Sequence, residues 1–333
     1  MNRRHFLALG ATAAGGALVP LRLLADPTPE RMNEHQHVDA IIVGGSYAGL
    51  AAGMALGRAL RRVLIVDSGL PCNRQTPFSH NFITQDGVPP HLIAATARAQ
   101  VERYATVAFT HGTVTALSPT ADGFDVRLED GAAYRAKKLV FATGVRDVLP
   151  PIPGFAACWG ISVLHCPYCH GYEVRDEATG VLGNGERGFE LARLISNWTK
   201  DLTLFTNGPS TLTEAQAAKL RAHDIRIMET AVAELEHTQG QLQRIHFVDG
   251  SAADIHALYA MPAFEQHCTL PQQLGCALTD EGYLQVDPQQ RTTVPGIYAA
   301  GDSTLRLRTV ANAVASGTTA GMMLNKDLVT AEF

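Results

Sequence analysis

Two glycine-rich turns with matching spacing constrain the fold of this 333-residue chain more than any other feature. The first follows the apolar run "VDAIIV" and contains Gly44 and Gly49, with Ser46 at the place of the middle glycine of G-x-G-x-x-G. The second has the complete motif, formed by Gly183, Gly185 and Gly188. Each turn lies between an apolar strand and a helical segment, which is the pattern of a dinucleotide-binding βαβ unit. The sequence therefore predicts two dinucleotide-binding units in one chain.

The segment after each of the two units has the pattern of an antiparallel β meander. Short alternating runs are separated by turn dipeptides, which are typical of β-hairpins. These dipeptides are Asp122-Gly123 and Asp130-Gly131 in the first half, and Gln239-Gly240 and Asp249-Gly250 in the second. We therefore expect an α/β protein with two Rossmann-like, three-layer domains, each with an antiparallel β meander.

Polar residues and glycines at strand ends extend the first nucleotide site. Asp67 ends the second strand, 18 residues after Gly49, and is placed to accept hydrogen bonds from an adenosine ribose. Gly144 ends the run "KKLVFATG", and Gly301 and Asp302 end "VPGIYAAGDS". Asp302 at a strand end could hold the ribityl hydroxyls of a flavin. Its alternative role is that of an ordinary helix N-cap.

The stretch "HCPYCHGYE" contains cysteines and histidines that could take part in redox chemistry or bind a metal. Cys166 and Cys169 are separated by two residues, with His165 before them and His170 after them. This spacing admits a zinc clip, a redox dithiol, or the C-x-x-C-H attachment site of a c-type haem.

Zinc would need two further ligands at suitable spacing, and Cys268 with Cys276 make a poor second pair. A haem would leave both nucleotide motifs unused, and a glutaredoxin-like unit does not fit between "PIPGF" and "GNGERG". The sequence therefore favours a redox dithiol and no metal. Cys72, Cys158, Cys268 and Cys276 are assigned no role, because isolated cysteines are more often buried apolar residues.

Taken together, the motifs resemble the low-molecular-weight thioredoxin reductases, which are FAD-dependent disulfide oxidoreductases. The resemblance covers nearly all of the chain after about residue 36 and rests on "GGSYAG", Asp67, "ATG", "CPYCHGYE", "GNGERG" and "AAGDS". It implies a discontinuous FAD domain at 36–150 and 278–333, with a nicotinamide-type domain carrying the dithiol at 153–277. It also implies a homodimer.

The resemblance implies a role for each site residue. Cys169 would exchange electrons with the flavin and Cys166 would meet the substrate. His170 stands where these reductases usually carry an acid and would shuttle a proton. FAD would be held by Gly44, Ser46, Gly49, Asp67, Gly144, Gly301 and Asp302, and NADPH or NADH by Gly183, Gly185 and Gly188.

The direction of electron flow stays open. Thr206, 18 residues after Gly188, lies in "LFTNGPSTLT", which has neither an acid for NAD nor an arginine for NADP. The motif is also similar to that of dithiol oxidases acting on gliotoxin and holomycin, which pass electrons through FAD to oxygen. The alternatives are thus an NAD(P)H-dependent reductase and an oxygen-coupled dithiol oxidase, with a flavin electron carrier ranked third. The partner would be a thioredoxin-like protein or a small-molecule dithiol or disulfide.

The N-terminus predicts export. Arg3 and Arg4, followed by Phe6 and Leu7 and an apolar stretch, resemble a twin-arginine signal within residues 1–30, with Ala25 as a cleavage point. We therefore expect a periplasmic or otherwise exported protein. A membrane tether through an uncleaved signal and a cytoplasmic location are the alternatives. The glycines, Pro20 and Arg22 make this stretch a poor membrane span.

Overall composition excludes other classes of protein. With 46% hydrophobic and 18% charged residues, the chain can bury the cores of two domains. A net charge of -5 without a long basic run gives no reason to expect a nucleic-acid partner.

Overall fold

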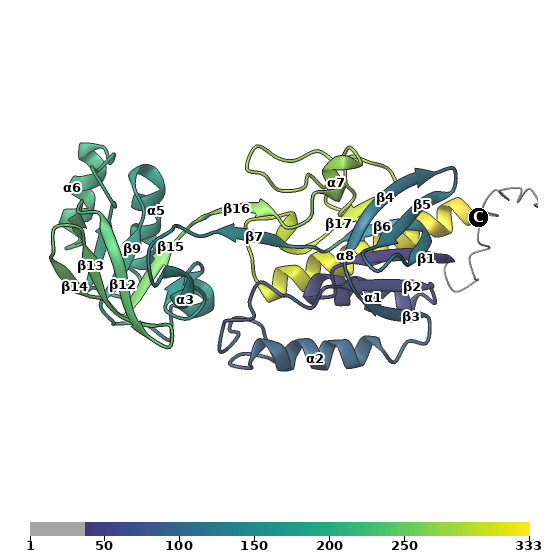
Figure 1. Ribbon diagram of the computed structural model, residues 1–333, viewed down its shortest axis with the longest axis horizontal. Coiled ribbons are helices and arrows are strands. Elements are labelled where there is room, and N and C mark those ends of the chain that lie inside the picture. The colour runs from purple at the N-terminus through teal and green to yellow at the C-terminus, as the bar shows by residue number, and fades with distance from the viewer. Residues whose placement is uncertain (1–36) are drawn as a thin grey trace, which may run out of the picture.

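The computed structural model describes residues 37–333, which form two lobes joined by a pair of strands (Figure 1). The twin-arginine stretch lies outside the described residues. Within them, no helix has the length and apolar character needed to cross a membrane.

The first lobe is built on one mixed sheet. Its order is β3 (Val107–His111), β2 (Val63–Asp67), β1 (His37–Val43), β6 (Ala133–Phe141), β5 (Gly123–Leu128) and β4 (Val114–Thr120), with β17 (Ile297–Ala299) also paired to β6. Strands β1, β2, β3, β6 and β17 are parallel, whereas β4, β5 and β6 form the antiparallel meander. The predicted hairpin turns are confirmed, because they connect β4 to β5 and β5 to β6.

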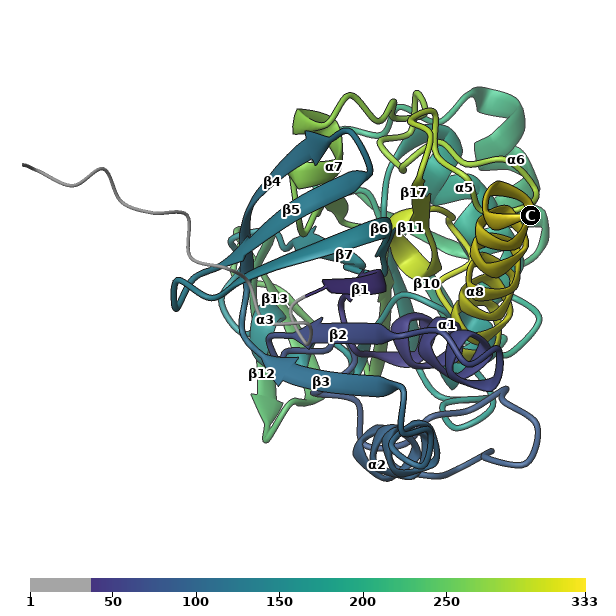
Figure 2. The same cartoon turned by 90° about the vertical axis from the view of Figure 1, so that its right-hand side faces the viewer.

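Alternation along β1 produces three layers. Ala40 and Ile42 pack into a core with α1 (Tyr47–Arg58), α2 (Pro90–Val101) and α8 (Val310–Glu332), whereas Ile41 and Val43 pack into a second core with the meander. This division follows from the period of two in a strand. Figure 2 shows α1 and α8 on one side of the sheet and β4 and β5 on the other.

The second lobe repeats this architecture. Its parallel sheet has the order β11 (Arg226–Met228), β10 (Leu202–Phe205), β9 (Thr179–Leu182), β15 (Ala257–Ala260) and β8 (Val163–Leu164). One core joins the sheet to α5 (Gly185–Ile195) and α6 (Glu214–Ala222). The other joins it to the meander of β12 (Val232–Thr238), β13 (Gln241–Phe247) and β14 (Ala252–Asp254).

Two antiparallel strands, β7 (Val145–Val148) and β16 (Ala263–Gln266), connect the lobes (Figure 1). The chain enters the second lobe through β7 and returns through β16, so the first lobe is discontinuous. The short helices are α3 (Phe155–Cys158), α4 (Pro167–His170), α7 (Leu270–Gln273) and the 3₁₀ turn η2 (Gly301–Ser303). The predicted fold class is confirmed, and the residue limits proposed for the domains stay predictions.

Candidate functional site

The first glycine-rich turn is closed by backbone contacts that exclude larger residues. Gly44 has φ +104°, and a Cβ there would lie 2.3 Å from the carbonyl oxygen of Ala142. A Cβ on Gly49 would lie 1.8 Å from the carbonyl oxygen of Gly44. Helix α1 therefore begins directly over the end of β1, which directs its free N–H groups at the space beyond the sheet.

Polar groups around this turn fit a dinucleotide. Ser46 is the N-cap residue of α1, and its hydroxyl makes no capping hydrogen bond. Asp67 accepts a hydrogen bond from the Gly45 N–H at 3.1 Å, which fixes the carboxylate at the end of β2. The buried Thr143 hydroxyl, next to Gly144, has no partner within the described part of the chain. The turn thus offers free donors to a pyrophosphate and an acceptor to a ribose.

Asp302 lies in a buried group of charges rather than at a helix N-cap. It belongs to η2, whose N-cap residue is Ala300. Arg308 Nε lies 3.7 Å from Asp302, and the two terminal nitrogens of Arg308 donate to Asp147 at 2.7 and 2.9 Å. Burial raises the pKa of the Asp302 carboxyl, and the charge of Arg308 opposes that rise. The ordinary capping role considered from the sequence is therefore wrong.

Cys72, which is outside the C-x-x-C motif, lies beside Asp302. The Cys72 thiol donates to Asp302 Oδ2 at 3.7 Å, although Cys72 follows β2 and is distant in sequence. Cys72 is an exposed residue whose sulfur contacts Asp302. Loss of water around the sulfur, followed by the charge of Asp302, raises the pKa of this thiol to about 12. Cys72 is therefore a protonated thiol at neutral pH.

The predicted redox cysteines lie at the start of a short helix. Cys166 is the N-cap residue of α4, Pro167 is its first helical residue, and the Cys169 N–H donates to the Cys166 carbonyl at 3.2 Å. Both thiols are free. Within residues 37–333, no group of three or more His, Cys, Asp or Glu side chains is arranged to hold a metal ion.

The two thiols differ in acidity. A hydrogen bond from the Cys169 thiol, helped by the backbone N–H groups of Cys169 and Tyr168, lowers the pKa of Cys166 against the effect of burial. The same hydrogen bond, burial and the negative charges of Cys166 and Asp302 raise the pKa of Cys169. Of the two thiols, Cys166 is therefore the more acidic and Cys169 the less acidic. Within this pair, the charge of Asp302 from the first lobe acts on the pKa of Cys169.

Histidines adjoin the dithiol on both sides. Burial, followed by the charges of His80 and His165, lowers the pKa of His170 to about 4. His165 is likewise lowered to a pKa of about 4, by burial and by the charge of Arg308. Both imidazoles are neutral at pH 7, so His170 is available as a proton acceptor. His80 lies 3.5 Å from Glu173 of the same motif, which links a loop of the first lobe to the redox segment.

The second glycine-rich turn is also closely packed. A Cβ on Gly188 would lie 2.7 Å from the carbonyl carbon of Gly183. Gly185 has φ +54°, and Asn184 is the N-cap residue of α5. The Asn184 side-chain oxygen accepts hydrogen bonds from the Gly185 N–H and the Thr211 N–H, both at 2.8 Å. The loop after β10 is therefore fastened to the turn.

The polar side chain that ends β10, Thr206, is already hydrogen-bonded within the lobe. The Thr206 hydroxyl donates to the carbonyl oxygen of Gly208 at 2.6 Å and lies 3.3 Å from that of Met228. Glu186, in the first turn of α5, accepts a hydrogen bond from Gln216. Its negative charge opposes binding of a phosphate at this helix start.

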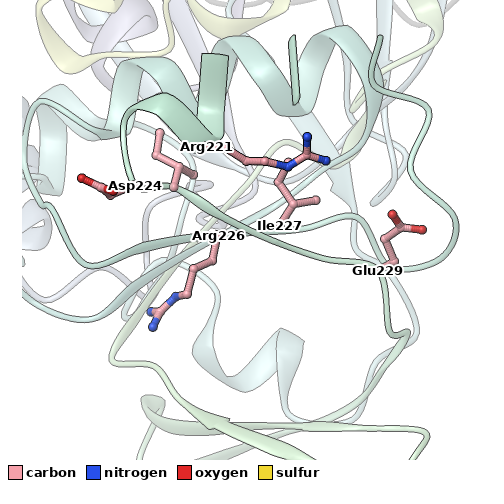
Figure 3. A pocket seen from close by; sticks show the side chains of 6 residues that line it. Arg221, Asp224, Arg226, Ile227 and Glu229 are labelled. Carbon is pink, nitrogen blue, oxygen red and sulfur yellow. The ribbon is translucent and has the colours of Figure 1, made fainter. Parts of the chain in front are cut away.

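A surface hollow of about 390 Å³ lies elsewhere, along β11 and the end of α6 (Figure 3). Arg221, Asp224, Arg226 and Glu229 line it. The two guanidinium groups point away from each other, and Arg226 is paired with Asp201. The arginines therefore do not converge on a single anion.

Comparison with known proteins gives the family. The model of the family described as pyridine nucleotide-disulphide oxidoreductase matches residues 38–317. The chain belongs to this family. As a thioredoxin reductase-like pyridine nucleotide-disulphide oxidoreductase, it is an oxidoreductase with FAD as its cofactor.

Individual members of this family match over nearly their whole length. "Thioredoxin reductase tcpT" of Claviceps purpurea is 35% identical over 90% of this chain and 96% of its own. The structure titled "The crystal structure of the oxidoreductase from Agrobacterium tumefaciens" is 36% identical with a TM-score of 0.83, over 88% of this chain and 99% of that one. The structure titled "Crystal structure of HlmI" is 33% identical with a TM-score of 0.84, and the match covers 89% of this chain and 94% of that one.

Sequence reasoning missed several residues that surround the predicted site. They are Cys72, His80, Asp147, Tyr259 and Arg308, which come from different loops and strands. No motif links them, since each reaches the site only through long-range contacts. Only the structure marks one of them, because the charged side chain of Arg308 is nine-tenths buried.

Proposed function

We propose that this FAD-dependent oxidoreductase removes two electrons from a dithiol substrate and delivers them to oxygen, without a nicotinamide donor. The observation that carries the proposal is the set of five hydrogen bonds made by the Asn184 side chain. They go to Gly185, to the N–H and hydroxyl of Thr211, and to the carbonyl oxygens of Thr206 and Pro209. They hold the loop after β10 against the turn where the pyrophosphate of NAD(P)H would bind.

Electrostatics support the same choice. A 2'-phosphate needs a basic side chain near the end of β10, and the loop from Thr206 to Thr213 has none. A ribose needs a free carboxylate there, and the loop has none. Glu186 at the start of α5 adds a negative charge where the phosphates would lie. An electron donor that binds elsewhere, at the dithiol itself, meets none of these obstacles.

The disulfide exchange is assigned to Cys166 and Cys169. One thiolate of the substrate attacks Cys166 of the Cys166–Cys169 disulfide, so that a mixed disulfide forms and Cys169 leaves. The second substrate thiol then displaces Cys166, the substrate departs as a disulfide, and the enzyme holds a dithiol. The lowered pKa of Cys166 suits the second displacement, because it makes Cys166 the better leaving thiolate there.

His170 completes the proton balance. Its imidazole is neutral at pH 7 and follows Cys169 directly in the chain, so it can accept a hydrogen bond from the Cys169 thiol and pass the proton on to water as that thiol gives up its electrons. FAD, when bound, accepts the two electrons of the dithiol and passes them to oxygen, which leaves as hydrogen peroxide. The two protons lost by the substrate thiols are those that peroxide gains.

The surroundings of Cys166 suit a substrate that approaches from solvent. Tyr168 and Tyr172 are 61% and 67% exposed, and the guanidinium of Arg175 lies 4.1 Å from the centre of the Tyr172 ring. Exposed aromatic rings offer contact area to an apolar ligand. A small-molecule dithiol and a thioredoxin-like protein both fit this proposal.

Oxygen consumption tests the proposal. Purified protein with FAD, supplied with dithiothreitol in air, should consume oxygen and release an equal amount of peroxide. Cys166→Ser and Cys169→Ser should each abolish this turnover, whereas Cys268→Ser, a control at another partly exposed cysteine, should retain it. Turnover that survives in both serine variants, or that starts only when NADPH is added, would contradict the proposal.

A further inference from the structure

The side-chain amide of Gln266 has partners for its nitrogen but not for its oxygen. Gln266 ends β16, and its Nε2 donates to the carbonyl oxygens of Gly282 and Ser303 at 2.9 and 3.0 Å. Its Oε1 is buried and accepts no hydrogen bond within residues 37–333. Turning the amide over would not help, because both neighbours of Nε2 are acceptors and would then face an oxygen. The buried oxygen therefore needs a donor that the described residues do not supply.

Gln266 lies between two loops of the predicted FAD site. Because β16 pairs with β7, Gln266 lies opposite Val145, which directly follows Gly144 (Figure 1). On its other side, Nε2 holds the carbonyl of Ser303, the residue after Asp302. The amide thus joins the loop after β6 to the turn that carries the expected ribityl contact.

Both loops lie at the carboxyl edge of the parallel strands. β17 pairs with β6 in the register of Ala299 to Phe141, and the Ala300 N–H donates to the Phe141 carbonyl at 2.9 Å. In an open α/β sheet, ligands bind beyond the carboxyl ends of neighbouring strands. The Thr143 hydroxyl, which is buried without a partner in the described part of the chain, lies in the first of these loops. Two unpaired polar groups, on Thr143 and Gln266, therefore adjoin the same edge.

The chemistry of FAD indicates which group could donate to Gln266. Phosphates and ring carbonyls only accept hydrogen bonds, so the donors of oxidised FAD are its adenosine end, its ribityl hydroxyls and the ring N3–H. The adenosine end is expected at Asp67 on β2, and β1 and β6 lie between β2 and β17 in the sheet. The ribityl chain is expected at Asp302, next to the carbonyl that Gln266 holds. Its three hydroxyls offer more donors than one carboxylate uses.

We propose that Gln266 Oε1 accepts a hydrogen bond from a ribityl hydroxyl of FAD, beside the hydroxyl that Asp302 binds. One amide then fixes the turn that carries Asp302 through its nitrogen and the cofactor through its oxygen. FAD binding is common to a nicotinamide-dependent reductase and an oxygen-coupled oxidase. The inference therefore goes beyond the proposed function and does not depend on the direction of electron flow.

Binding of FAD analogues to the full chain, after removal of its flavin, tests this contact. The Kd for FAD and for its 2'-, 3'- and 4'-deoxyribityl analogues is measured by fluorescence quenching in the wild type and in Gln266→Leu. With FAD, the Kd of the variant should exceed that of the wild type by about tenfold. With the analogue that lacks the bonded hydroxyl, this ratio should fall by about fivefold, because the contact is then missing from both proteins. Gln285→Leu, at an exposed glutamine of the same lobe, should bind all four flavins as the wild type does.

The analogue series separates this contact from a structural role. Gln266→Leu also removes the two hydrogen bonds made by Nε2, but their loss weakens the binding of all four flavins equally. Gln266→Met, which keeps the length of the side chain, takes its place if Gln266→Leu folds poorly. An equal ratio for FAD and all three analogues, or wild-type affinity for FAD in a folded variant, would overturn the proposal. The measurement contains no dithiol and no NADPH, so failure of the proposed oxidase function would leave its result unchanged.

Discussion

The side-chain oxygen of Asn184 lies 2.8 Å from the backbone nitrogen of Thr211 and accepts its hydrogen bond. The contact joins the start of α5 to the loop after β10, which are the two elements that hold NAD(P)H in a nicotinamide-binding domain. In this chain the start of α5 and the loop after β10 are hydrogen-bonded to each other. We propose that the complete glycine motif serves here as a tight helix–strand packing unit.

Asn184→Ala should destabilise the second lobe. It removes the N-cap of α5 and five hydrogen bonds, so the free energy of unfolding should fall by about 1–3 kcal/mol. Denaturant unfolding measures this change, and Asn197→Ala, at an exposed asparagine after the same helix, is the control. Equal stability of the two variants would show that the loop is not held by Asn184.

His170 should act as a neutral base across the physiological range. Its pKa is lowered from 6.5 to about 4, so the base form is already dominant at pH 5 and is lost only as the pH falls through about 4. Titration of His170 should therefore not change the rate of dithiol turnover between pH 6 and 8. His170→Ala should lower turnover by about 10²-fold or more, and His223→Ala, at an exposed histidine, should not. A fall in wild-type activity centred near pH 6.5 and absent in His170→Ala would contradict the lowered pKa.

Asp302→Ala should weaken retention of FAD. The carboxylate is buried at the end of β17, where the family resemblance implies a contact with the ribityl chain, and Arg308 stays paired with Asp147 when Asp302 is removed. Loss of one charge-assisted hydrogen bond costs about 1.5–3 kcal/mol, or roughly ten- to hundredfold in affinity. The ratio of flavin to protein absorbance after dialysis measures it. Asp280→Ala, at an exposed aspartate of the same lobe, is the control, and equal retention would remove Asp302 from the FAD site.

Sequence reasoning predicted the parts of the molecule that depend on local spacing. The glycine motifs, the hairpin turns and the Pro167 helix start follow from the conformations that glycine, turn residues and proline favour within a few residues. The proximity of Cys72 to Asp302 could not be predicted this way. It depends on how β2 and β17 are placed in one sheet, and no local pattern encodes that distance.

The same reasoning predicted the cysteine pair but not its environment. Tyr259 lies opposite Leu164, just before the redox motif, because β15 pairs with β8, although 95 residues separate the two in the chain. Asp147 and Arg308 meet because β7 leaves the first lobe beside the loop that precedes α8. Such contacts form where strands and loops that are distant in the chain lie side by side in the folded structure. The sequence shows only the residue types that could make them.

Replacement of both Arg3 and Arg4 by Lys should retain the protein in the cytoplasm, because the exporter reads the arginine pair. These residues lie outside the described part of the chain, so export stays a proposal. Fractionation of a tagged chain, with the wild type beside it, measures the distribution. The same distribution for both chains would contradict the proposal of export.

The most direct test of the central claim is anaerobic reduction of the flavin, followed by admission of air. Dithiothreitol should bleach the flavin absorbance rapidly, and oxygen should then restore it with release of peroxide. NADPH and NADH should both reduce the flavin slowly and with little preference between them, because no basic side chain in the loop after β10 can bind the 2'-phosphate of NADPH. Rapid and strongly NADPH-selective reduction, with sluggish recovery in air, would contradict the account and leave a nicotinamide-dependent reductase.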